Sequence, residues 1–435
     1  MTMAFETRVS YRREALQRMA IGIGAVTSLS VLGRRLTFAQ QESGSGVPRT
    51  GETSPQLRPL DELMASFVKQ HDVPGASLAV MKGAKLVYAR GFGLADTETK
   101  RGVQPNSLFR IASVSKPLTA VAILQLWQKK KLRLEDRVFD ILPANDWLPD
   151  QHDPRLKEIT VRQLLQHTGG WDRDKSFDPI VNAREAVRVL GKSLPASAED
   201  IARYTLTLPL DFDPGKRYAY SNVGYLLLGR IIQQTSSQTY EAFVKQNVLA
   251  PIKVSRMSLG RASESSLDIN EVRYLDRKHR VIPAVNGGKI GTDVPLVYGG
   301  ENIEGYEAHG GWIASAADLV KFAAALTGAA KPVLLKPPAL KELVSRPSGA
   351  AGHKPDGTPM PVYYGLGFNV RPIGREDRFN VWHDGLIAGT SSLLVLRHDG
   401  FCWAVLFNTD RSPDDKVLSG LIDPLIHQAI DSVNW

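Results

Sequence analysis

The chain has 435 residues, enough for two or three ordinary domains or for one elaborate two-part enzyme. Its hydrophobic content of 43% and charged content of 23% are those of a soluble globular protein. The formal net charge is +9, of which residues 1–39 carry +4, with six arginines against two glutamates. The rest is spread along the chain without a long basic stripe or a nucleic-acid-binding motif, so the sequence predicts no nucleic-acid partner.

Residues 1–39 have the features of an export signal. Arg12 and Arg13 form the pair typical of a twin-arginine signal. The apolar stretch 19–32 that follows is too short and too rich in glycine and serine to span a bilayer comfortably. Small residues then surround an expected cleavage site after Ala39. The alternative interpretation is an amphipathic N-terminal helix on a cytoplasmic protein.

Cysteine usage agrees with export through the twin-arginine route. Cys402 is the only cysteine, so no intramolecular disulfide can form. A protein exported already folded from a reducing cytoplasm needs none. We therefore expect a periplasmic protein that keeps no integral membrane segment once the signal is removed.

The first elements after the signal follow from composition and periodicity. Residues 40–59 are rich in Gly, Ser, Pro, Thr and Gln, which predicts a flexible linker. Helical periodicity runs over 60–69, and strands are expected at 76–80 and 86–93 with a hairpin turn at 82–85. Folded structure is therefore expected to begin near residue 60.

A serine and a lysine three residues apart open a strongly apolar helix predicted over 114–128. One helical turn places the Lys116 amine over the same face as the Ser113 hydroxyl. A serine hydroxyl is a poor nucleophile until a base takes its proton, and a desolvated lysine can be that base. The spacing alone is weak evidence for a catalytic pair, because Ser66 and Lys69 repeat it in a segment that no other catalytic motif accompanies.

The rest of the chain predicts helices followed by strands. Helices with long loops are expected between about 145 and 290, at 161–166, 198–206, 223–234 and 240–248. The end returns to strands at 365–370, 391–397 and 401–407, with a tight turn at 398–400 and a final amphipathic helix over 415–430.

Strands at both ends with helices between them predict an α/β (α+β) protein. We expect one antiparallel sheet assembled from both ends of the chain and flanked by helices, with an inserted, mainly helical domain. In this division the domain spans 60–435, with its sheet part at about 60–144 and 291–435 and its helical part at about 145–290.

Five segments in chain order resemble the serine β-lactamase and penicillin-binding-protein superfamily, in its class C-like branch. That branch includes class C β-lactamases, related carboxylesterases, D-aminopeptidases and D-Ala-D-Ala carboxypeptidases. The resemblance covers about 60–408, essentially the whole expected mature domain, and implies the serine β-lactamase-like fold. The five segments are 109–116, 159–170, 214–225, 309–319 and 382–385.

Three residues would carry the chemistry that the resemblance implies. Ser113 would be the nucleophile, with its own backbone N–H turned toward the developing oxyanion at a helix N-terminus. Lys116 would accept or relay the serine proton if burial lowers its pKa. Tyr220 would act as its phenolate-like partner, passing a proton to the leaving group and later activating water.

Four further residues would support the reaction. Asn222 would hydrogen-bond Lys116 and the acyl group of the substrate. His383 and Gly385 would form the third motif, and the backbone N–H of Leu386 would be the second oxyanion donor, worth about 3–4 kcal/mol of transition-state stabilisation.

Each candidate also has a structural interpretation. Ser113 could be an ordinary N-cap, and Tyr220 could be a core aromatic with a satisfied hydroxyl. His-x-Gly occurs four times in the chain, and His383 is preferred for its place in the motif order and for the strand expected after it. Histidine spacing predicts no metal site, no cofactor is expected, and the absence of Gly-x-Ser-x-Gly argues against an α/β-hydrolase.

The third motif departs from the Lys-Thr-Gly of many lactamases. Here a histidine, charged only part of the time near neutral pH, precedes Asp384, which adds negative charge beside the expected place of a substrate carboxylate. Both changes favour a neutral ester or amide substrate over a β-lactam.

We therefore expect a periplasmic serine hydrolase that forms an acyl-enzyme on Ser113 and cleaves esters or D-amino-acid-type amides. Its partner would be a small-molecule or peptide-like acyl substrate, and the sequence sets no oligomeric state. The alternatives are a D-Ala-D-Ala carboxypeptidase or weak β-lactamase acting on cell-wall-like substrates, and a catalytically silent peptidoglycan-binding protein.

Overall fold

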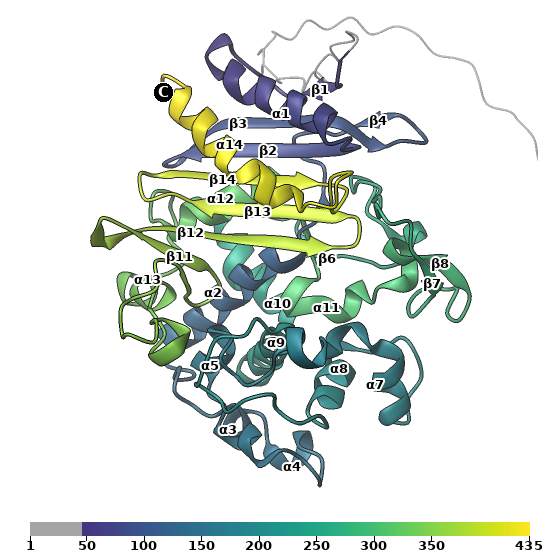
Figure 1. Ribbon diagram of the computed structural model, residues 1–435, viewed down its shortest axis with the longest axis vertical. Coiled ribbons are helices and arrows are strands. Elements are labelled where there is room, and N and C mark those ends of the chain that lie inside the picture. Colours follow the sequence, from purple (N-terminus) through teal and green to yellow (C-terminus); the bar gives the residue numbers. More distant parts are fainter. Residues whose placement is uncertain (1–45) are drawn as a thin grey trace, which may run out of the picture. The chain divides into compact units, whose positions relative to one another are not determined.

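A nine-stranded antiparallel sheet dominates the computed structural model, which describes residues 46–435 apart from the side chains of 375–377 (Figure 1). Strands run in the order β1-β3-β2-β14-β13-β12-β11-β10, with β4 paired to β3. The predicted signal and the first residues of the predicted linker lie outside the described part. The strands are β1 (Arg49–Thr50), β2 (Gly75–Lys82), β3 (Lys85–Asp96), β4 (Arg101–Gly102), β10 (Tyr363–Tyr364), β11 (Asn369–Ile373), β12 (Arg375–Ile387), β13 (Thr390–Leu396) and β14 (Phe401–Phe407).

The two ends of the domain meet in the middle of this sheet. β2 pairs with β14 along the whole of β14, from Phe401 opposite Lys82 to Phe407 opposite Ala76. The predicted sheet built from both ends of the chain is therefore confirmed.

Alternation along the strands gives the sheet two apolar faces. Trp403, Val405 and Phe407 pack with helices α1 (Arg58–Gln70) and α14 (Leu418–Ser432) on one face. The intervening Cys402, Ala404 and Leu406 belong to the larger core on the other face, where α12 (Ala316–Leu326) crosses β14 and β2. Figure 1 shows α1 and α14 lying together across the strands.

The helical part is organised around α9 (Asn222–Ser236), of which eleven residues are buried. It contacts α2, α5, α8, α10 and α11. Reciprocal capping boxes fix the starts of α5, by Thr160 with Gln163, and of α8, by Ser197 with Asp200. The remaining helices are α2 (Ser115–Gln128), α3 (Val138–Ile141), α4 (Ala144–Trp147), α5 (Val161–Leu165), α6 (Arg173–Ser176), α7 (Ala183–Val189), α8 (Ala198–Thr205), α10 (Tyr240–Val244), α11 (Ile303–Gly310) and α13 (Pro337–Leu343).

Short strands complete the fold beside the main sheet. β9 lies between β5 and β6, and β7 and β8 form a separate hairpin. Three of the five fall inside the region expected to be mainly helical or at its edge. They are β5 (Phe109–Arg110), β6 (Ser258–Leu259), β7 (Val281–Pro283), β8 (Asp293–Pro295) and β9 (Trp312–Ala314).

Ordered structure begins earlier than expected. The segment 40–59 was expected to be a flexible linker, but Arg49 and Thr50 form β1 and pair with Phe92 and Gly91 of β3. The Thr50 hydroxyl also donates to the carbonyl of Val103, so contacts made by the folded sheet, rather than local composition, order this stretch.

The segment 365–370, expected to be one strand, is a turn followed by the first two residues of β11. Gly367 has φ +88°, which makes a turn between β10 and β11, and Tyr364 pairs with Asn369 across it. A Cβ on Gly367 would lie 2.5 Å from the Cβ of Ala120, so the turn approaches α2 where only glycine fits. The final helix begins at Leu418 rather than 415, and α10 ends at Val244, followed by a wider helical turn to Leu249.

Candidate active site

Ser113 lies in a tight helical turn, Ala112–Val114, that leads directly into α2. The preceding Ala112 has φ +45°, a strained conformation for a residue with a side chain. The turn is held against the sheet, because the Ser392 hydroxyl on β13 donates to the Ile111 carbonyl at 2.8 Å. The hydroxyl of Ser113 is thus presented at the junction of the sheet and the helical part.

The Lys116 side chain is fully buried and has three partners. Its Nζ lies 3.1 Å from Ser113 Oγ, and it donates to Asn222 Oδ1 at 2.7 Å and to the carbonyl of His309 at 2.8 Å. The last two partners can only accept. A neutral amine has two N–H groups, which these acceptors occupy, so its lone pair faces the Ser113 hydroxyl.

The end of α11 supplies one of these acceptors. The last carbonyls of a helix have no partner within the helix. In α11 the Thr119 hydroxyl satisfies the carbonyl of Ala308 and Lys116 satisfies that of His309. Both donors come from α2, so the packing of α11 against α2 sets the position of the amine.

Tyr220 completes the contacts of the Ser113 hydroxyl. Its hydroxyl donates to Ser113 Oγ at 2.8 Å, and the Nζ of Lys116 lies 4.9 Å from the centre of its ring. His167 stacks on the same ring at 4.4 Å and accepts the backbone N–H of Ser221 at Nδ1. The loop before α9 is thereby held beside Ser113.

Asn222 is fixed by a carboxylate that sequence reasoning missed. Its Nδ2 donates to Asp178 Oδ2 at 2.6 Å, which leaves Oδ1 for Lys116. Because the two ends of the amide have opposite hydrogen-bonding character, this contact determines which end faces the amine.

Burial sets the protonation states of the central groups. Desolvation lowers the pKa of Lys116 well below its ordinary value and raises the pKa of Tyr220 well above its own. The amine is therefore suited to act as a base, and the phenol keeps its proton until the reaction demands it. The phenolate-like character expected of Tyr220 is therefore absent from the resting site, because burial raises the pKa of its hydroxyl.

His383 lies within β12 rather than ahead of a strand, and it is buried. Its Nδ1 donates to the carbonyl of Asp384 at 2.7 Å, and its Nε2 accepts from the Tyr364 hydroxyl at 2.9 Å. Burial lowers the pKa of His383 to about 4. The third motif therefore offers a neutral, internally bonded imidazole, while the Asp384 side chain is exposed.

The part of β12 that carries Gly385 and Leu386 has a free edge. On one side β11 pairs no further than Trp382. On the other, Ile387 pairs with Thr390 across a two-residue turn, which makes that pair the hydrogen-bonded one. By alternation the N–H of Leu386 points away from β13 toward the free edge, as an oxyanion donor requires.

Gly385 is required by a close approach. A Cβ there would lie 2.2 Å from Ser392 Oγ and 2.4 Å from the Ile111 carbonyl oxygen. Glycine at this position therefore allows β12 to lie directly against the turn that carries Ser113.

The structure thus brings together Ser113, Lys116, Tyr220 and Asn222, and places the β12 segment of the third motif against the nucleophile turn. Sequence reasoning missed four contributors to the site. They are the guanidinium of Arg173 over the Tyr220 ring, the carboxylate of Asp178, the imidazole of His167 and the carbonyl of His309. His167 and His309 lie in two of the family segments, 159–170 and 309–319, but no local pattern in them predicts these contacts.

Ser66 and Lys69, the second copy of the spacing, lie elsewhere, in α1. Ser66 is exposed, and neither residue has a contact with the site.

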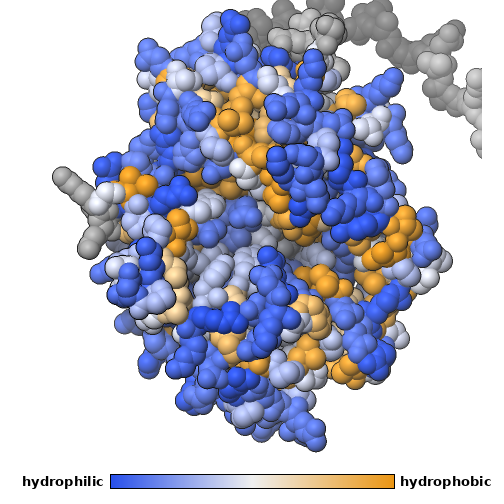
Figure 2. All heavy atoms as spheres, in the orientation of Figure 1, coloured by the Kyte–Doolittle hydropathy of each residue, from blue (hydrophilic) through white to orange (hydrophobic). Residues whose placement is uncertain are grey.

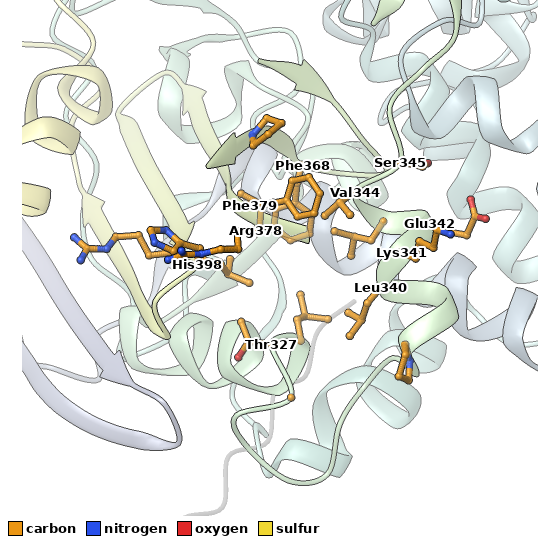
Figure 3. Close-up of a pocket in the computed structure, with 18 of the residues that line it drawn as sticks. Thr327, Leu340, Lys341, Glu342, Val344, Ser345, Phe368, Arg378, Phe379 and His398 are labelled. Atoms are coloured by element: carbon orange, nitrogen blue, oxygen red, sulfur yellow. The ribbon is translucent and has the colours of Figure 1, made fainter. Parts of the chain in front are cut away.

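The described domain has two concave surface features. The face shown in Figure 2 is mostly hydrophilic and is hollowed in the middle, below the sheet. A separate pocket of about 1390 Å³ lies between α13 and strands β11 and β12 (Figure 3). It contains none of the predicted site residues, although its lining residues Tyr363 and Phe368 adjoin the site-facing Tyr364 and Gly367.

Among the side chains that the structure describes, no three His, Cys, Asp or Glu are grouped to hold a metal ion. None of the described helices is long and apolar enough to cross a bilayer.

Comparison with known proteins identifies a matching family and several relatives. A protein-family model described as Beta-lactamase matches residues 60–424. The chain is 30% identical over 233 residues to Penicillin-binding protein 4* of Bacillus subtilis (strain 168), covering 51% of this chain and 46% of that protein. It is 28% identical over 215 residues to Protein flp of Staphylococcus aureus (strain N315), covering 49% and 40%. The chain thus spans less than half the length of these curated relatives.

Solved structures share the fold at low sequence identity. D-amino acid amidase from Ochrobactrum anthropi SV3, complexed with L-phenylalanine amide, has a TM-score of 0.64 and 21% identity, over 87% of this chain and 98% of that one. The octameric penicillin-binding protein homologue from Pyrococcus abyssi has a TM-score of 0.61 and 23% identity, over 85% and 77%. At these identities the likeness concerns the fold.

Proposed function

The chain belongs to the beta-lactamase family, and from that membership we propose that it is a serine hydrolase that forms an acyl-enzyme on Ser113. One observation carries the proposal. The Ser113 hydroxyl lies between a buried amine, at 3.1 Å from Lys116, and a buried phenol, at 2.8 Å from Tyr220. One neighbour can take the serine proton while the other supplies a proton to the leaving group.

The proposed acylation step is balanced by these two groups. Ser113 Oγ attacks the acyl carbon as Lys116 accepts its proton, and the backbone N–H groups of Ser113 and Leu386 receive the oxyanion. Tyr220 then donates its proton to the departing amine or alcohol. The acyl-enzyme forms beside an ammonium and a phenolate, whose opposite charges stabilise each other.

Deacylation reverses the two transfers. The Tyr220 phenolate takes a proton from water, and the resulting hydroxide attacks the acyl carbon. Ser113 Oγ leaves and recovers its proton from Lys116, which restores the resting site.

We propose neutral esters or D-amino-acid-type amides as substrates. Neutral His383 and exposed Asp384 give a substrate carboxylate no cation at the third motif, which supports this choice. The D-amino acid amidase named above shows that this fold can carry an amidase, and its likeness to this chain is one of fold alone. Likeness to Penicillin-binding protein 4* favours the alternative, a D-Ala-D-Ala carboxypeptidase or weak β-lactamase.

A fluorophosphonate probe tests the nucleophile. We expect the wild-type protein to be labelled and Ser113→Ala to remain unlabelled. Ser66→Ala is the matched control, because it removes the serine of the second Ser-x-x-Lys copy and should label like the wild type. Equal labelling of the wild type and Ser113→Ala would contradict the assignment of Ser113 as nucleophile and favour the alternative, a catalytically silent binding protein.

A substrate panel tests the specificity. We expect turnover of p-nitrophenyl esters and of D-alanyl amides to exceed that of a chromogenic cephalosporin. Predominant cephalosporin turnover would contradict the argument from Asp384 and favour the lactamase alternative.

We also propose export to the periplasm by the twin-arginine route, supported by Arg12, Arg13 and the short apolar stretch after them. In a bacterium with a periplasm, the double variant Arg12→Lys/Arg13→Lys should stay in the cytoplasmic fraction. The double variant Arg34→Lys/Arg35→Lys keeps the pair and should still be exported. Periplasmic recovery of the first variant would exclude this route.

A further inference from the structure

The loop 172–178 brings two opposite charges to the neighbours of the catalytic amine. Arg173 begins the short helix α6, and its guanidinium carbon lies 4.4 Å from the centre of the Tyr220 ring. Asp178 follows the same helix and accepts a hydrogen bond from Asn222 at 2.6 Å. Neither residue has a contact with Ser113, so any effect on the reaction passes through Tyr220, Asn222 or the field at the amine.

Asp178 acts on the amide of Asn222. By accepting from Nδ2 it holds Oδ1 toward Lys116, and a rotated amide would turn its NH₂ toward the amine instead. Asp178 itself is held in place, because the backbone N–H of Ile180 donates to its other carboxylate oxygen at 3.4 Å. Its negative charge also favours the protonated form of Lys116.

Arg173 acts on the ring of Tyr220. A cation over an aromatic face is attracted to the ring, more so when the phenol becomes a phenolate. The same positive charge disfavours a second cation at Lys116, whose Nζ is also 4.9 Å from that ring centre.

We propose that Arg173 and Asp178 are a pair of positioning residues that hold Tyr220 and Asn222 and oppose each other in setting the charge of Lys116. The inference rests on the proposed hydrolase and names two residues that control its base. Loop 172–178 would therefore determine the pH range in which the nucleophile is activated.

Several other ionisable groups surround Lys116, and their protonation states determine which of them contribute a charge beside that of Arg173 and Asp178. His167, His309 and His383 are buried with lowered pKa values and stay neutral, and the raised pKa values of Tyr220 and Tyr225 keep both phenols protonated. The ionisable groups that remain are Arg173 and Asp178 from the loop and Asp384 from β12. Burial raises the pKa of Asp178, and the hydrogen bonds from Asn222 and Ile180 oppose that rise.

The direction of each effect follows from the sign of the charge. Burial lowers the pKa of Lys116 most, Asp178 raises it, and Arg173 lowers it again. Below that pKa the amine is an ammonium and cannot accept the serine proton, so kcat/KM falls on the acid side. Neutralising Arg173 should move this acid limb to higher pH, and neutralising Asp178 should move it to lower pH.

The test is the pH profile of kcat/KM for p-nitrophenyl acetate hydrolysis between pH 5 and 9. We expect the acid limb to shift upward by about half a pH unit or more in Arg173→Gln and downward by a similar amount in Asp178→Asn. Asp178→Asn keeps an acceptor for Asn222, so it isolates the charge. Arg173→Lys should restore the position of the limb, because the charge is kept.

A matched control comes from the same helix. Lys175→Gln removes a positive charge from an exposed side chain that pairs with Asp211 and contacts neither Tyr220 nor Asn222, so it should leave the limb in place. Shifts in the same direction for Arg173→Gln and Asp178→Asn, no shift in either, or an equal shift in the control would overturn the inference. If Asp178→Asn does not fold, the difference between Arg173→Gln and Arg173→Lys decides alone.

Failure of the proposed function itself would give a different experimental result. In that case the wild type itself would neither hydrolyse the ester nor take the fluorophosphonate label. An active wild type with unmoved acid limbs refutes only the roles of Arg173 and Asp178.

Discussion

At the residue scale, the most informative difference from the sequence expectation is His383. A histidine in the place of a lysine predicted a partly charged group, but its two ring nitrogens are occupied by Tyr364 and by the carbonyl of Asp384. With a pKa of about 4 it is neutral at physiological pH. The exposed carboxylate of Asp384 is therefore the charged group that this motif presents.

This arrangement predicts discrimination by substrate charge. We expect the wild type to prefer a neutral ester over a matched ester with a carboxylate on its leaving group. Asp384→Asn should raise the relative kcat/KM of the anionic ester by roughly threefold to tenfold, because one repulsive charge is removed. Using the ratio of the two esters cancels any effect on Lys116, and an unchanged ratio at low salt would show that Asp384 does not face the substrate.

At the element scale, β12 joins the sheet to the site. Its register with β13 turns the N–H of Leu386 to a free edge, and its glycine allows contact with the turn that carries Ser113. The strand pairing therefore places a free backbone N–H at this edge, where the proposed reaction needs an oxyanion donor, without any side chain taking part.

Gly385→Ala tests this close approach. The new methyl would collide with Ser392 and with the Ile111 carbonyl, which has to separate β12 from the nucleophile turn. We expect kcat/KM to fall by about a hundredfold or more, since a misplaced donor loses most of its effect, and stability to fall by about 1–3 kcal/mol.

The matched control is Gly420→Ala in α14, where a Cβ has open space. It should be neutral or stabilising by about 1 kcal/mol, because alanine favours helix. Ester kinetics and thermal unfolding measure both variants. Wild-type activity in Gly385→Ala would show that β12 can move without cost.

At the scale of the whole described domain, the site depends on three distant parts of the chain. Ser113 and Lys116 come from the turn before α2 and from its first residues. Tyr220 and Asn222 come from the inserted helical part, and Leu386 comes from the returning strands. Pairing of β2 with β14 and packing of α1 on α14 unite the two ends. Loss of the C-terminal helix should therefore weaken the fold as a whole.

Ile430→Ala tests the contribution of α14. This side chain is fully buried against the sheet, so its truncation should lower the free energy of unfolding by about 2–5 kcal/mol. Leu425→Ala in the same helix removes a side chain that is 36% exposed and should cost less than about 1 kcal/mol. Urea unfolding measures both, and equal losses would mean that α14 does not anchor the sheet.

The sequence by itself determined the family resemblance, the sheet built from both ends of the chain and the candidates Ser113, Lys116, Tyr220 and Asn222. These follow from short-range patterns, because periodicity, capping and motif spacing are properties of neighbouring residues. The boundaries that it placed wrongly depend on distant contacts, as where β3 orders Arg49 and Thr50.

Only the tertiary structure decided how the site is charged and supported. The carbonyl of His309 has no sequence signature, and Arg173 and Asp178 lie in a loop without periodicity. The pKa values of Lys116 and His383 depend on burial by segments far apart in the chain. Burial and distance across the fold set these properties, and neither can be expressed as a spacing along the sequence.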